Sequence, residues 1–75
     1  MYTIRYSTED YRGRPYFSCY IEDTITDARK TFRNVCSSLR SDWFNSTYRK
    51  IYVSLMSEDL LLDEYSLDDA NRVNE

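Results

Sequence analysis

The apolar residues of this chain change their spacing twice, from every second residue to a helical spacing and back again. In the middle of the chain they recur mostly at three- and four-residue intervals, which places them on one stripe of an α-helix. The stripe consists of Ile25, Ala28, Phe32, Val35, Cys36, Leu39 and Trp43. Thr24 stands at the N-cap position, and Asp27 follows three residues later, as a capping-box carboxylate does. The pattern predicts one long amphipathic helix.

Strand-like alternation flanks this helix on both sides. Apolar and polar residues alternate in residues 2–7, 16–21 and 50–56, which is the period of a strand with one buried face. The polar residues 8–14 contain the only glycine, Gly13, and predict a hairpin connection longer than a two-residue turn. Residues 60–65 fit either a fourth strand, paired through a turn at residues 57–59, or a short acidic helix.

These elements predict a small two-layer α+β fold. We expect a ββαβ(β) order, with an antiparallel sheet and one amphipathic helix packed on one face. Residues 1–67 are expected to form a single compact domain, and residues 68–75 an acidic, frayed C-terminal tail. The helix is expected to cover Tyr2, Ile4, Tyr6, Phe17, Cys19, Ile21, Ile51, Val53 and Leu55. No second helix is available for the other face, so we expect that face to be exposed and to carry the function.

The composition argues against catalysis and against a metal or cofactor. The 75 residues include no histidine, which is the usual general base, and one glycine cannot build a glycine-rich phosphate loop. Cys19 and Cys36 cannot complete a tetrahedral zinc site by themselves. We expect them to be buried, reduced thiols, which pair only if the fold brings them together. The sequence therefore predicts a protein that is not an enzyme and that holds no metal or cofactor.

The chain shows no membrane-spanning or secretory pattern. Residues 1–7 alternate polar and apolar side chains and contain no apolar core of a signal peptide. The longest apolar run is residues 60–62, far short of the ~20 residues that span a bilayer. We therefore expect a cytoplasmic protein without a membrane partner.

Tyrosines and basic residues are expected to share the exposed face of the sheet. Strand alternation assigns Arg5, Tyr16, Tyr20, Lys50 and Tyr52 to it. The loop residues Tyr11, Arg12 and Arg14 would extend it. Such a face could stack single-stranded nucleic acid bases, or could form a protein or homodimer interface, in which Tyr and Arg are common anchors. Tyrosine also has a high strand propensity that needs no function.

Three acidic pairs recur at a five-residue interval near the C-terminus: Glu58-Asp59, Asp63-Glu64 and Asp68-Asp69. Residues 57–75 hold seven acids and one base, whereas residues 1–56 hold nine bases and six acids. The leucines between the pairs favour a docked element over a freely solvated tail. The acidic end could also cover the basic loop of the same chain, or imitate a nucleic acid backbone on a basic partner. This polarity indicates partners rather than chemistry.

The sequence predicts a non-enzymatic protein-binding module. In size and composition it resembles the small acidic inhibitors that mobile elements deploy, such as anti-restriction and anti-CRISPR proteins. That resemblance implies occupation of the surface of a host nucleic-acid-handling enzyme, with the acidic pairs engaging basic side chains. One alternative is a small single-stranded nucleic-acid-binding protein that uses the Tyr/Arg face. Another is a homo-oligomeric structural subunit.

Overall fold

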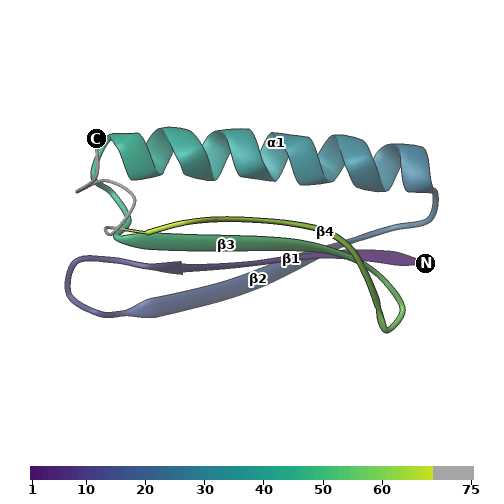
Figure 1. Cartoon of the computed structure of the whole chain (residues 1–75), viewed down its shortest axis with the longest axis horizontal. Helices are drawn as coiled ribbons and strands as arrows, with labels where there is room; N and C mark the ends of the chain where they lie inside the picture. The colour runs from purple at the N-terminus through teal and green to yellow at the C-terminus, as the bar shows by residue number, and fades with distance from the viewer. Residues whose placement is uncertain (69–75) are drawn as a thin grey trace.

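Four antiparallel strands and one helix form two layers in the computed structural model, which describes residues 1–68 (Figure 1). The elements are β1 (Tyr2–Glu9), β2 (Pro15–Glu22), α1 (Ile25–Phe44), β3 (Lys50–Ser57) and β4 (Leu60–Leu67). The strand order is β2-β1-β3-β4, so β2 and β4 are the edges. The predicted α+β fold is confirmed, and residues 60–65 lie in a strand rather than in a helix.

The β1–β2 hairpin is closed by Asp10. Its carbonyl accepts a 3.0 Å hydrogen bond from the Gly13 N–H, and its Oδ1 accepts from the N–H groups of Arg12 (2.9 Å) and Arg14 (3.0 Å). Gly13 has φ 78°, a left-handed conformation that glycine adopts without steric cost. The hydrogen bond from the Arg14 N–H is the main cause that lowers the pKa of Asp10. The turn fixes the hairpin register, in which Glu9 pairs with Pro15.

Helix α1 begins as predicted. Thr24 is the N-cap, and its Oγ1 accepts a 3.2 Å hydrogen bond from the Asp27 N–H. At the other end Asn45 caps the helix, and Ser46 (φ 62°) turns the chain toward β3. The predicted stripe faces the sheet, with Ala28, Phe32, Leu39 and Trp43 buried.

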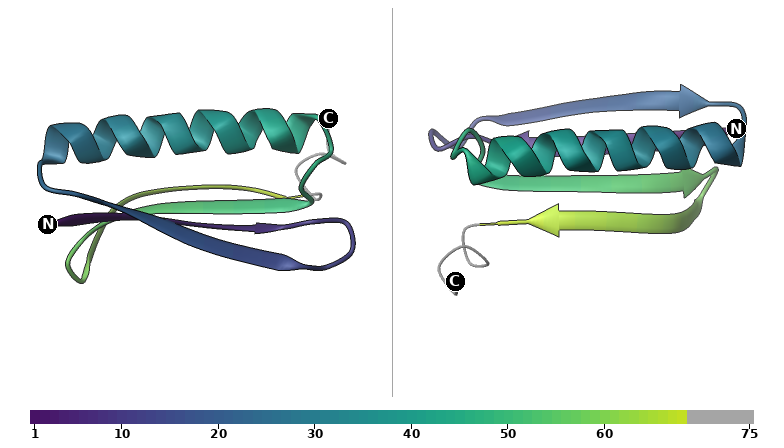
Figure 2. Two further views of the ribbon diagram at one scale, coloured as in Figure 1. Left: turned by 180° about the vertical axis from the view of Figure 1, so that it is seen from behind. Right: turned by 90° about the horizontal axis from the view of Figure 1, so that it is seen from above.

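The core lies between α1 and the two central strands. Ile4 of β1 and Ile51, Val53 and Leu55 of β3 are at most 2% exposed. Seen from above, α1 runs over the middle of the sheet with β2 and β4 on either side (Figure 2). A helix with its side chains is only about 10–12 Å wide and strands are ~4.8 Å apart, so one helix fully covers about two strands.

The predicted orientation of β2 is wrong. Ile4 pairs with Tyr20, so the even-numbered residues of β2 face α1 and the odd-numbered residues face away. Phe17 and Ile21, expected in the core, are 78% and 60% exposed, and Cys19 is exposed as well. Alternation predicted the opposite orientation because the odd-numbered face is the more apolar one, whereas the other face also carries Ser18 and Glu22.

No helix within residues 1–68 is long and apolar enough to cross a membrane. In the same residues no three His, Cys, Asp or Glu side chains cluster in a way that could hold a metal ion.

Candidate functional site

The sheet surface turned away from α1, here called the open face, has no covering element within residues 1–68 (Figure 1). The strand registers place on it Arg5 and Ser7 of β1, Phe17, Cys19 and Ile21 of β2, Lys50, Tyr52, Ser54 and Met56 of β3, and Leu61, Glu64 and Ser66 of β4. Four large apolar or aromatic side chains (Phe17, Ile21, Tyr52 and Leu61) project into solvent here, with Tyr52 40% exposed. Charged side chains surround them.

An open cavity of about 660 Å³ lies in this face. Phe17 and Tyr52 flank Ser7 from the two neighbouring strands, while Cys19 and Ser54 flank Arg5. The cavity therefore has two aromatic walls and one guanidinium. Such a surface offers apolar contact area together with polar groups that can orient a partner. This combination is typical of a protein interface.

The Tyr52 hydroxyl donates a 2.9 Å hydrogen bond to Glu64 Oε2 on the open face. This hydrogen bond to the carboxylate stabilises the neutral phenol and is the main cause that raises the pKa of Tyr52. Burial and the charge of Glu64 act in the same direction. Glu64 thus places an acidic group beside the aromatic wall.

The predicted tyrosine-and-base face is only partly assembled. Arg5, Lys50 and Tyr52 lie on the open face, as expected. The placement of Tyr16 and Tyr20 there is wrong, because the hairpin register turns both toward the helix side. Tyr11, Arg12 and Arg14 are exposed at the hairpin end. Their role in binding a partner stays a prediction.

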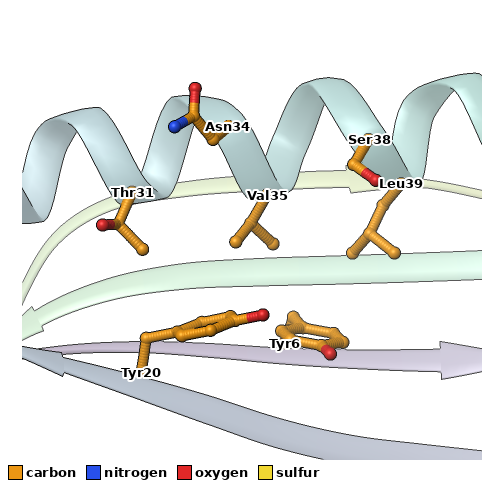
Figure 3. A pocket seen from close by; sticks show the side chains of 7 residues that line it. All are labelled: Tyr6, Tyr20, Thr31, Asn34, Val35, Ser38 and Leu39. Atoms are coloured by element: carbon orange, nitrogen blue, oxygen red, sulfur yellow. The ribbon is translucent and has the colours of Figure 1, made fainter.

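Tyr20 instead belongs to a groove under the helix. Its ring stacks on Tyr6 with centroids 6.1 Å apart and an interplanar angle of 23°. Figure 3 shows both rings below α1, with Thr31, Val35 and Leu39 pointing toward them. Tyr20 remains 47% exposed, since α1 does not extend over β2.

The first two acidic pairs follow the β3–β4 hairpin and do not share one face. Glu58 and Asp59 form its turn. Adjacent strand residues point to opposite faces, so Asp63 lies on the helix side near Cys36 while Glu64 lies on the open face. Asp68 follows β4, and Asp69 lies outside the described residues, as does most of the predicted tail at 68–75. Five residues of extended chain span about 16 Å, so the acids from Glu58 to Asp68 mark the whole length of the β4 edge.

The two cysteines differ in environment and are not paired. Cys19 is exposed on the open face, whereas Cys36 is half-buried on the helix and packs against the core. Burial, followed by the charge of Asp63, raises the pKa of Cys36 to about 11. The expectation of two buried thiols therefore fails for Cys19.

Comparison of the chain with protein-family models, curated proteins and solved structures finds no match. The function must therefore be inferred from the geometry of the chain itself. The sequence patterns placed Phe17, Cys19 and Ile21 under the helix and therefore did not predict that they form an exposed surface. The signal that could have marked them is the absence of charge from residues 15–21 of an edge strand.

Proposed function

We propose that this protein is a non-enzymatic protein-binding module that docks through the open face. The observation that carries the proposal is the exposure of Phe17 (78%) and Ile21 (60%) on a sheet face that no element within residues 1–68 covers. Leaving such side chains in water forgoes roughly 25 cal/mol for each Å² that a partner would bury. Contiguous apolar surface rimmed by polar groups is a usual mark of an interaction site.

The charges of the open face favour a protein partner over nucleic acid. Arg5 and Lys50 could contact phosphates, but Glu64 lies on the same face and is bonded to Tyr52, the only tyrosine there among the described residues. Tyr16 and Tyr20, which a base-stacking platform would need, lie on the other side of the sheet. The net charge of the chain is -3. A polyanion would meet repulsion beside its stacking surface.

The position of the acids suggests the character of the partner. Glu58, Asp59, Glu64 and Asp68 follow the β4 side of the molecule, next to the apolar open face. A protein surface with an apolar centre and a basic margin would complement both parts, and opposite charges would accelerate the encounter. Nucleic-acid-handling enzymes present such basic surfaces. In this proposal the protein acts as an inhibitor by occupying one of them.

The test is capture of partners from a nuclease-treated cell lysate by three tagged proteins. They are the wild type, the double variant Phe17→Thr/Ile21→Thr, and the control Tyr16→Thr. Tyr16 lies on the same strand and is 53% exposed, but it faces the helix side. We expect a basic nucleic-acid enzyme to be retained by the wild type and the control and lost with the double variant.

Binding and activity assays with the purified partner then measure the affinity for this protein and the inhibition of the partner. Neutralising Glu58 and Asp59 to Gln and Asn should slow association at low salt and change it little at high salt. A partner that binds the double variant as well as the wild type would contradict docking through the open face. Partners that are captured from an untreated lysate but lost after nuclease treatment would support the nucleic-acid alternative instead.

A further inference from the structure

Strand β2 has a free edge along its whole length. It pairs with β1 on one side, and no other strand within residues 1–68 pairs with its second side. Seven of its eight residues are exposed. We propose that this edge pairs antiparallel with β2 of a second copy, forming a dimer with one continuous eight-stranded sheet. This inference goes beyond docking through the open face and does not depend on it.

The hairpin shows which backbone groups of β2 are free. The Asp10 N–H donates to the Arg14 carbonyl (3.2 Å), so this pair is a hydrogen-bonded one. Hydrogen-bonded and non-hydrogen-bonded pairs alternate along an antiparallel ladder. The even-numbered residues of β2 therefore bond to β1, and the N–H and C=O groups of Phe17, Cys19 and Ile21 point outward. Pro15, which has no N–H, falls in the outward set, where proline is tolerated.

The opposite edge of the sheet is protected, whereas β2 is not. Strand β4 carries Asp63 and Glu64, and its pairing with β3 is interrupted by a bulge next to Leu55 and Met56. Charges and bulges are the usual means by which edge strands avoid pairing with other chains. Residues 15–21 of β2 contain no charge and have a regular register with β1. The asymmetry marks β2 as the edge that is left open to pairing.

The charges at the two ends of β2 select a second copy in antiparallel orientation. Arg12 and Arg14 precede the strand, while Glu22 ends it and Asp23 follows. Antiparallel self-pairing brings the basic end of one copy beside the acidic end of the other, at both ends of the interface. Parallel pairing would place like charges together, which is unfavourable.

A two-fold axis at Cys19 gives the best side-chain match. It places Phe17 of one copy opposite Ile21 of the other on the open face, a favourable pair of an aromatic and a β-branched side chain. Both residues belong to the outward set, so their backbone groups can bond. On the helix side Tyr16 comes opposite Glu22 of the second copy, and Tyr20 opposite Ser18. No like charges face each other within the paired strands.

The dimer would bury side chains that the single chain leaves in water. Among residues 1–68, four of the ten exposed large hydrophobic side chains lie on β2: Tyr16, Phe17, Tyr20 and Ile21. An axis perpendicular to the sheet keeps both helices on one side, with the Tyr16 and Tyr20 rings of both copies between them. The two open faces then join into one surface of twice the area.

The test is the molar mass in solution, measured by sedimentation from micromolar to millimolar concentration. We expect the wild type to approach twice the 9.1 kDa of the chain as concentration rises. Cys19→Pro removes an outward N–H and should raise the dissociation constant at least about tenfold while the fold is kept. Ser18→Pro removes an N–H that bonds to β1, and it should unfold the chain. Cys19→Lys, which keeps the backbone, is the second variant and should also weaken the dimer.

Oxidation with oxidised glutathione tests the register. The axis at Cys19 puts the two Cα atoms about 5.5 Å apart, within disulfide range, whereas an axis at Ser18 puts them about 8 Å apart. We expect a disulfide dimer that Cys19→Ser abolishes and Cys36→Ser leaves intact. A wild type that stays monomeric throughout, or folded Cys19→Pro and Cys19→Lys variants that associate like the wild type, would overturn the proposal. The proposal would also be overturned by a protein that stays monomeric and whose β2 amides are protected from hydrogen exchange only when a different protein is bound.

Discussion

Tyr52 of β3 and Glu64 of β4 are joined across the open face by a 2.9 Å hydrogen bond from the phenol to Oε2 of the carboxylate. The bond links a residue of a central strand to the acidic edge strand. It connects the aromatic wall of the candidate binding face with the charge that we propose steers the partner. Because both side chains reach solvent, the bond acts on the protonation of Tyr52 more than on the stability of the fold.

Replacing Glu64 with Gln should lower the pKa of Tyr52 toward its ordinary value, because the hydrogen bond to the carboxylate is the main cause of the rise. NMR titration of ring-labelled tyrosine, assigned with Tyr52→Phe, measures this directly. The fold raises this pKa above the unfolded value near 10.0, so the contribution of Tyr52 to stability is present below pH 10 and is lost as the pH rises further. An unchanged pKa in Glu64→Gln would contradict the assigned contact. The free energy of unfolding should change by no more than about 0.5 kcal/mol at neutral pH, given the solvent screening.

The two thiols should react at very different rates. The pKa of Cys36 is raised from about 9.0 to about 11, which cuts its thiolate fraction near pH 8 about 100-fold, and its side chain is half-buried. A disulfide reagent should therefore show one fast and one slow phase, and Cys19→Ser should remove the fast one. Asp63→Asn should accelerate the slow phase, since the carboxylate opposes the thiolate. Equal rates for both thiols in the wild type would contradict the structure.

Substitutions in the core and on the open face should have clearly different effects on the free energy of unfolding. Leu55 is fully buried, and Leu55→Ala should cost about 2–5 kcal/mol through lost burial and a cavity. Phe17 is 78% exposed, so Phe17→Thr should change the free energy of unfolding by no more than about 0.5 kcal/mol. Denaturant unfolding at low protein concentration, where dimers are dissociated, measures both. A large loss from Phe17→Thr would mean that Phe17 packs into the fold rather than serving a partner.

The helix was predictable from sequence because its signals are local. Seven apolar residues at helical spacing, with Thr24 at the N-cap, define both the element and its inward face. The strands β1 and β3 were predictable for the same reason, since Ile4, Val53 and Leu55 alternate with more polar neighbours. Residues 60–65 were ambiguous alone, and their pairing with β3 decided in favour of a strand.

The sequence by itself determined the helix and the first three strands, because hydrophobic period depends only on neighbours along the chain. Only the tertiary structure decided which face of β2 is covered. Alternation favours covering the more apolar face, but the Asp10 turn and the pairing of Ile4 with Tyr20 turn the other face toward α1. The tertiary structure also decided how much is covered, because one helix is too narrow to shield a four-stranded sheet. Tyr16 and Tyr20 stay exposed for that reason. Phe17, Cys19 and Ile21 are exposed because the register turns them away from α1, and the candidate surface is the result.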